Sequence, residues 1–414
     1  MWYTLDLVHG GVAAGGARPR HDHRSTQEDP EEPIMLASQN FVIPPLPTII
    51  FGQGTSLKLS DQIQGLGLHA ALIVTDKNLH ASGVLAPVID ALRTANIHVD
   101  VFDGVEPNPT DKNVEAGAAM LNKLDTACVV TIGGGSSMDC GKAIALLAAN
   151  GGTVEAMQAT TPAPAKSPVI AVPTTAGTGS ETNNACVITN SGLGRKTYVI
   201  HPSILPAFAI LDPDLTVGLP TYPTATCGFD VLTHATEAFV SIAASAHSDA
   251  VALDAIGKVA NNLRRVVEDG SDTEARAQML LGSAQAAMAF NVAGLGTVHG
   301  TGHAISARLN AAHGQTLATM LPHVMEYNMP EREEKYAQVA RLLDPSSAGT
   351  GTAAIDAVLQ LRSDIGIDKS IRDLGGQDAL LPTLVEDAAA DLINGFNPRP
   401  VDAAAFEALY RAAW

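Results

Sequence analysis

The chain contains short apolar runs, each ended by a polar residue or glycine, that alternate with stretches of helical periodicity. Residues 70–75 (Ala-Ala-Leu-Ile-Val-Thr) and 127–132 (Ala-Cys-Val-Val-Thr-Ile) are such runs, and they are typical of strands buried on both faces. Apolar residues recur at helical spacing over residues 84–95 and 113–124. This order of strand, helix, strand and helix predicts a Rossmann-like, doubly wound parallel sheet.

The pattern changes after residues 211–216 (Leu-Asp-Pro-Asp-Leu-Thr). Strand-like runs stop there, and Ala- and Leu-rich segments with helical spacing continue to Trp414. We therefore expect an α/β domain over residues 35–212 and an α-helical domain over residues 213–414. Residues 1–34 have neither a helical nor a strand period and are expected to form a disordered N-terminal arm, which makes Met35 a candidate start.

Composition narrows the class of protein. The 414 residues are 46% hydrophobic and 16% charged, which predicts a globular protein with an ample core. Lys and Arg number 25 against 43 Asp and Glu, and the resulting net charge of −18 argues against nucleic-acid binding. The four cysteines form no CxxC pair, and no run reaches the roughly 18 apolar residues of a membrane helix. We expect a cytoplasmic protein that binds no membrane.

Two loops are candidate nucleotide-binding segments. Gly133–Asp139 follows the second strand-like run and precedes a helix, so its glycines and the helix N-terminus could receive a pyrophosphate. A tight turn between strand and helix is the alternative. Pro173–Glu181 concentrates hydroxyl groups and glycines where a strand ends, which is where open α/β sheets bind ligands. An ordinary surface loop would also explain this segment.

Asp76 directly follows the first strand-like run. A carboxylate at this place can hydrogen-bond an adenosine ribose and would repel a 2′-phosphate, which favours NAD over NADP. Capping of the following helix is an equally good explanation of the same residue.

Acidic and histidine residues at helical spacing indicate a metal site. Asp230 and His234 are four residues apart, as are His299 and His303, and His313 follows closely. This spacing puts each pair on one face of a helix. A single histidine here is more often a core or surface residue, but two polar pairs in an apolar domain need partners. One Asp with several His and no Cys suits iron(II) or zinc.

Together these segments resemble the iron-containing (group III) alcohol dehydrogenase family, which shares its fold with dehydroquinate synthase. The resemblance extends from about Phe41 through Pro107-Asn108-Pro109, both loops, the Asp230 helix, His299–Gly314 and Asn397–Pro400 to the end of the chain. It implies that His303 transfers a proton and that the metal ligands are Asp230, His234, His299 and His313. It also implies a dinucleotide site made by Asp76, Asn108, Gly134, Gly135, Ser136, Asp139, Thr174, Thr175, Thr178 and Lys196. Ser137, Gly302 and Ala304 depart from the usual family pattern, and none of them is in either set.

The activity that the resemblance implies is hydride transfer between a small alcohol, or its aldehyde, and NAD. The metal, iron(II) or alternatively zinc, would act as a Lewis acid in the cleft between the two domains. We also expect a homodimer or larger homo-oligomer. Two other classes stay open, namely a non-redox lyase of the dehydroquinate-synthase type and a non-enzymatic protein that binds metal or nucleotide.

Overall fold

A six-stranded parallel sheet forms the centre of the N-terminal half of the chain. The computed structural model describes residues 40–159, 162–192 and 195–414, so the expected disordered arm of residues 1–34 and the candidate start at Met35 lie outside the described residues. In spatial order the strands of this sheet are β1 (Thr48–Phe51), β8 (Phe208–Leu211), β5 (Val169–Pro173), β4 (Ala127–Gly133), β2 (Ala70–Asp76) and β3 (His98–Val105). All neighbouring pairs are parallel, which confirms the predicted sheet.

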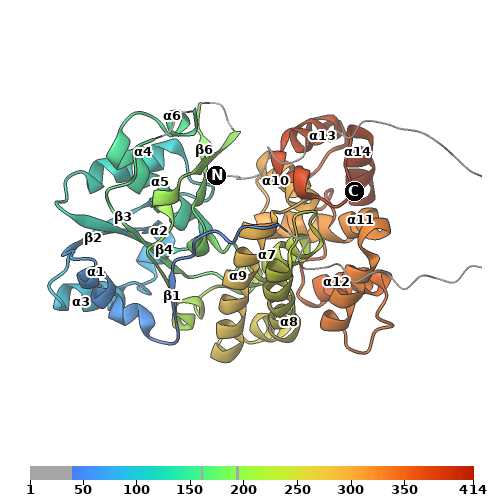
Figure 1. Ribbon diagram of the computed structural model, residues 1–414, viewed down its shortest axis with the longest axis horizontal. Coiled ribbons are helices and arrows are strands. Elements are labelled where there is room, and N and C mark those ends of the chain that lie inside the picture. Colours follow the sequence, from blue (N-terminus) through green and yellow to red (C-terminus); the bar gives the residue numbers. More distant parts are fainter. Residues whose placement is uncertain (1–39, 160–161, 193–194) are drawn as a thin grey trace, which may run out of the picture. The chain divides into compact units, whose positions relative to one another are not determined.

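Helices cover both faces of this sheet. Successive side chains of a strand point to opposite faces, and in β2 Leu72 belongs to one buried cluster while Ile73 belongs to another. Figure 1 shows α4 and α5 on one face of the sheet and α1 and α3 on the other. The helices of this half are α1 (Leu59–Gly65), α2 (Lys77–Ala81), α3 (Ala86–Thr94), α4 (Asp111–Leu121), α5 (Gly135–Asn150) and α6 (Val154–Ala159).

A separate antiparallel hairpin stands outside the main sheet. It consists of β6 (Ala185–Asn190) and β7 (Arg195–Ile200), which pair with each other, and an isolated bridge joins Thr189 of β6 to Thr110. We did not predict this hairpin from the sequence, although its buried residues Cys186, Ile188, Thr197 and Val199 alternate along the two strands as in a half-buried strand. Its strand β7 carries Lys196 and Tyr198, two residues that bear on the site described below.

The C-terminal half is helical, as the sequence predicted. After β8 the described residues contain no further strand, and the next long helix begins at Thr221. The precise domain limits at residues 212 and 213 stay a prediction. The helices are α7 (Thr221–Val240), α8 (Ala246–Glu268), α9 (Thr273–Ala293), α10 (Thr297–Leu309), α11 (His313–Leu343), α12 (Gly351–Asp364), α13 (Leu381–Ala390) and α14 (Ala403–Ala412).

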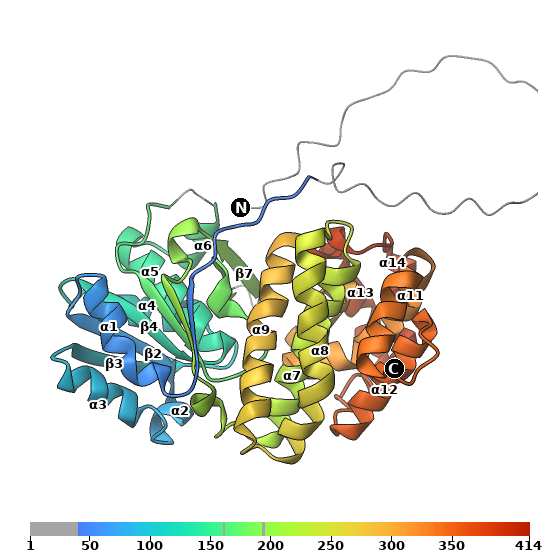
Figure 2. The same cartoon turned by 60° about the horizontal axis from the view of Figure 1, so that its bottom comes forward.

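Helix α7 is the central element of this half. From Thr224 to Val240 almost every residue is buried, so it is enclosed on all sides rather than amphipathic. Figure 2 shows α7, α8 and α9 side by side. Polar side chains on such a helix must find partners inside the protein. Within the described residues no single helix is long and apolar enough to cross a membrane; α9 and α10 meet that test only as a pair, which is bent by 111°.

Candidate metal centre and active site

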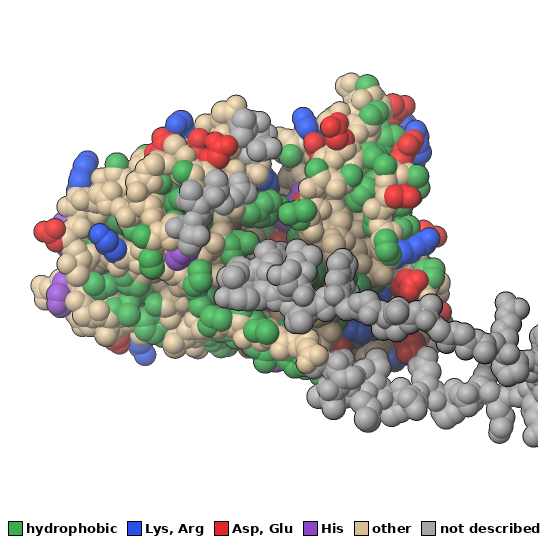
Figure 3. Space-filling view, turned by 45° about the horizontal axis from the view of Figure 1, so that its top comes forward, with side chains coloured by type: hydrophobic (Ala, Val, Ile, Leu, Met, Phe, Trp, Pro, Cys, Tyr) green, Lys and Arg blue, Asp and Glu red, His purple; other side chains and the backbone are tan. Residues whose placement is uncertain are grey.

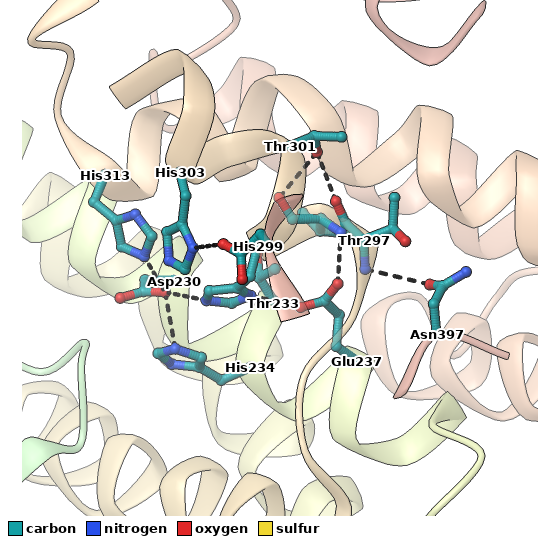
Figure 4. Close-up of polar contacts among 12 residues, drawn as sticks. Asp230, Thr233, His234, Glu237, Thr297, His299, Thr301, His303, His313 and Asn397 are labelled. Atoms are coloured by element: carbon teal, nitrogen blue, oxygen red, sulfur yellow. Dashed lines mark hydrogen bonds and ion pairs between the residues drawn. The ribbon is translucent and has the colours of Figure 1, made fainter. Parts of the chain in front are cut away.

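Three histidines from three helices converge on one carboxylate oxygen of Asp230. Asp230 and His234 lie one turn apart on α7, His299 is on α10, and His313 is the first residue of α11. The Nε2 atoms of the three histidines lie 3.4 Å (His234), 3.6 Å (His299) and 3.9 Å (His313) from Oδ1 of Asp230. Figure 4 shows the three rings pointing toward this carboxylate. The structure thus brings together all four residues that the sequence suggested as ligands.

The polar atoms of this cluster are short of partners. Oδ1 of Asp230 and Nε2 of His299 are buried and have no hydrogen-bond partner among the described residues. Buried polar atoms left in this way cost free energy. Asp230, His299 and His313 each offer a ligand atom, and these atoms lie within 4.8 Å of one another. One carboxylate with imidazole nitrogens suits iron(II) or zinc, so the residues fit a divalent metal.

The charges of the cluster also suit a cation. Burial would raise the pKa of Asp230, but the neighbouring histidines outweigh it and hold the pKa below its ordinary range. Burial lowers the pKa of His234 to about 4 and that of His313 well below its ordinary value. At neutral pH the cluster therefore holds an ionised carboxylate and two neutral imidazoles, the forms in which these side chains bind metals. His299 differs, because burial would lower its pKa but Glu237 and Asp230 outweigh this effect and raise the pKa to about 9. A metal that binds Nε2 of His299 must therefore displace a proton.

One side of the cluster is open. The side chains of Asp230 and His299 are 4% and 2% exposed, whereas that of His313 is 30% exposed. A small molecule can therefore approach from the His313 side. Figure 3 shows a hollow in the molecular surface at which histidine side chains lie.

His303 lies one turn after His299 on α10 and has partners of its own. Its Nδ1 is 2.8 Å from Oδ2 of Asp391 and 3.4 Å from the hydroxyl oxygen of Tyr198. Its ring stacks on His313, with the centroids 5.3 Å apart. Because Asp391 engages Nδ1, Nε2 is the nitrogen left for another proton partner. Burial lowers the pKa of His303 although Asp391 opposes the shift, so the ring is neutral at pH 7.

The two predicted nucleotide loops lie side by side at the carboxyl edge of the sheet. They follow β4 and β5, which are neighbouring strands, and the backbone N–H of Thr174 donates to the carbonyl of Gly133 at 2.9 Å. A Cβ on Gly135 would lie 2.7 Å from the Thr178 side chain, so only glycine fits there. The structure therefore brings together the predicted residues of both loops, which are Gly134, Gly135, Ser136, Thr174, Thr175 and Thr178.

The remaining predicted cofactor residues are more dispersed. Asn108 follows β3 with φ 57°, and its carbonyl accepts from the Thr189 hydroxyl at 3.4 Å. Burial lowers the pKa of Lys196 on β7, while the charges of Asp139 and Asp391 oppose the shift. Lys196 thus belongs to the hairpin and lies outside both nucleotide loops in the chain.

Two predicted cofactor residues have contacts within the protein that serve another purpose. Oδ1 of Asp76 accepts from the backbone N–H groups of Asn78 and Leu79, so Asp76 caps α2. Asp139 accepts with one oxygen from the Ser180 hydroxyl and with the other from the Val187 backbone N–H. A cap leaves the second oxygen of Asp76 for a ribose, whereas both oxygens of Asp139 are engaged. Their cofactor roles stay predictions.

Fold and site together define the class of protein. Its N-terminal part is an open parallel α/β sheet with a glycine-rich loop of the kind that binds nucleotides. Its C-terminal part is helical and carries a buried cluster of Asp and His side chains that fits a metal ion. The family model described as iron-containing alcohol dehydrogenase matches residues 46–213. The model of the C-terminal part of that family matches residues 224–414. The chain belongs to the iron-containing alcohol dehydrogenase family. The predicted alcohol dehydrogenase is thereby confirmed over the lyase and the non-enzymatic alternatives.

Individual relatives agree with this assignment. A 1,3-propanediol dehydrogenase of Klebsiella pneumoniae is 40% identical over 377 residues, which is 88% of this chain and 96% of the relative. An NAD-dependent methanol dehydrogenase of Bacillus methanolicus is 36% identical over 87% of this chain and 96% of the relative. A solved structure of a 1,3-propanediol oxidoreductase has a TM-score of 0.87 at 38% identity, and the match covers 91% of this chain and all of that one.

Proposed function

We propose that the protein is an NAD-dependent dehydrogenase that interconverts a small primary alcohol or diol and its aldehyde with one bound divalent metal, iron(II) or alternatively zinc. The observation that carries this proposal is the set of ligand atoms around Asp230. They lie close together, and two of them, Oδ1 of Asp230 and Nε2 of His299, are buried without a hydrogen-bond partner among the described residues. Asp230, His234, His299 and His313 would hold the metal. When bound, the metal would supply a Lewis acid for the substrate oxygen and NAD the hydride acceptor or donor.

In this proposal His303 handles the proton of the alcohol. Asp391 accepts a hydrogen bond from Nδ1 and fixes the ring, so Nε2 is the atom that takes up or returns the proton. The depressed pKa of His303 keeps the ring ready to accept a proton at neutral pH. Loop residues at the ends of β4 and β5 would bind the pyrophosphate through the N-terminus of α5.

The substrate is proposed to be short. The ring of Phe290 lies 4.8 Å from that of His234, so an aromatic wall borders the cluster. The relatives are named for propanediol and methanol, which are also small alcohols. The test is NAD reduction with primary, secondary and diol substrates after loading with iron or zinc; no reduction by any of them would contradict the proposal.

Replacing Asp76 is expected to narrow the preference for NAD over NADP. A carboxylate next to the adenosine ribose repels a 2′-phosphate. Asp76→Asn should therefore lower the ratio of kcat/KM with NAD to kcat/KM with NADP by about tenfold. Asn caps a helix about as well as Asp, so this change removes the charge and keeps the cap. Asp76→Gly should act alike at a small cost in stability. An unchanged ratio in both variants would show that Asp76 only caps α2.

We also propose a homo-oligomer in a reducing, cytoplasmic compartment. The four cysteines are free thiols. Phe41, Val42 and Ile43 are exposed by 40%, 67% and 49%, and they precede β1, an edge strand of the sheet. Exposed apolar residues beside an open strand edge are typical of interfaces. Analytical ultracentrifugation should give a mass of at least twice that of one chain. Replacing Val42 and Ile43 with lysine should lower the measured mass toward that of the monomer. A monomeric wild-type protein would contradict the proposal.

A further inference from the structure

Glu237 is a buried carboxylate beside the metal centre that has no part in the proposed ligand set. It lies on α7, one turn after His234, and is 4% exposed. One of its oxygens, Oε2, lies 2.5 Å from Nδ1 of His299, and the other, Oε1, accepts from the backbone N–H of Val298 at 2.7 Å. Figure 4 shows Glu237 on the side of His299 that faces away from Asp230. Helix α7 therefore contacts His299 through both Asp230 and Glu237.

These contacts fix the chemical state of the His299 ring. An ionised carboxylate only accepts hydrogen bonds, so Nδ1 of His299 must carry a proton and donate it. The other nitrogen, Nε2, then faces Oδ1 of Asp230 at 3.6 Å, where the metal would bind. Histidines that bind metals commonly donate their second N–H to a carboxylate, which sets the tautomer and the orientation of the ring.

The same carboxylate holds the beginning of α10. The residue before this helix, Gly296, provides no side-chain cap, and Val298 has one of the N–H groups that a helix leaves unpaired at its start. Glu237 supplies the missing acceptor, and its negative charge is favourable at a helix N-terminus. A Cβ on Gly296 would lie 3.1 Å from Oε1 of Glu237, so glycine permits this close approach. Ring and helix start are therefore fixed by one side chain.

We propose that Glu237 is a positioning residue that presents Nε2 of His299 to the metal. The inference rests on the proposed function, since it requires His299 to be a ligand. Two N–H donors face the two oxygens of Glu237, and a glutamine has only one oxygen to offer them. In Glu237→Gln the side-chain NH₂ group therefore faces one of these two N–H donors, either that of the His299 ring or that of Val298, and makes no hydrogen bond with it. The His299 ring or the start of α10 is then held less firmly.

The test measures zinc(II) affinity by competition with a chromophoric chelator. Glu237→Gln should bind zinc about 10–100-fold more weakly than the wild type, the usual effect of losing such a partner. The control is Asn397→Ala, which removes the acceptor of the neighbouring Thr297 N–H at 3.4 Å without touching His299. This control should lower the melting temperature and leave zinc affinity within about threefold of the wild type.

The outcomes separate this inference from the function on which it rests. Wild-type protein that binds no zinc or iron would overturn both. Tight wild-type binding with equal affinity in Glu237→Gln, or an equal loss of affinity in Asn397→Ala, would overturn the role of Glu237 alone. If Glu237→Gln does not fold, the wild type still decides: in zinc-loaded, ¹⁵N-histidine-labelled protein the proton of His299 should be on Nδ1, and a proton on Nε2 would overturn the inference.

Discussion

Replacing His299 or His313 with alanine is expected to release the metal and to abolish turnover. Each ring places its Nε2 within 4 Å of Oδ1 of Asp230, at 3.6 Å for His299 and 3.9 Å for His313. Loss of the metal would leave the buried Asp230 carboxylate without the positive charge that balances it. Losing about 4 kcal/mol of transition-state stabilisation lowers the rate roughly a thousandfold, and we expect at least this effect on kcat/KM.

The same variants should melt at lower temperature than the metal-loaded wild type. A metal present at a hundredfold excess over its Kd stabilises the native state by about 2.7 kcal/mol, and this increment disappears with the site. Chelation of the wild type should have the same two effects. His98→Ala is the matched control, because His98 pairs with Asp100 at the surface, 3.5 Å apart. Stoichiometric metal with wild-type turnover in His299→Ala would show that this ring is no ligand.

His303→Ala is expected to keep the metal and to lose turnover. His303 shares a helix face with His299, but its Nδ1 is engaged by Asp391, which leaves Nε2 for the substrate proton. Removing a positioned acid–base group lowers the rate by roughly 10²–10⁴. Metal content and the affinity for NAD should be close to those of the wild type.

The pH–rate profile of this variant provides the second readout. The neutral His303 ring accepts the proton in the wild type, because burial lowers its pKa. In His303→Ala hydroxide must take the proton instead, so turnover should rise with pH and recover part of the loss. Release of metal, with no recovery at any pH, would identify His303 as a ligand. An active variant with an unchanged profile would mean that His303 only packs against α11.

The parts of the fold that were predictable are those with a local signal. The strands β2 and β4 follow from apolar runs that are buried on both faces, and the Asp230 and His234 pair follows from helical spacing. The convergence of three helices on one oxygen was predictable only through the family resemblance. Spacing alone indicates which side chains share a face and says nothing about which faces meet.

Other features depend on residues far apart in the chain and left no local trace. Asp391 and Tyr198 are 88 and 105 residues from His303, which they contact. Glu237 was within reach of sequence reasoning, since it lies one turn after His234 on the same helix, but its partner His299 is 62 residues away. Asp76 has a local signal, but this signal has two explanations, because helix capping and ribose binding both require an Asp at this place. The structure shows the cap, and ribose binding stays a prediction.

The central claim is that Asp230, His234, His299 and His313 hold one divalent metal at the active site. Anomalous X-ray diffraction from crystals of iron- or zinc-loaded protein, recorded above and below the absorption edge of the metal, tests it most directly. We predict a single anomalous peak per chain within coordination distance of these four side chains, about 2.0–2.2 Å from the nitrogen and oxygen atoms. A peak elsewhere, or none in protein shown by elemental analysis to carry the metal, would contradict the account.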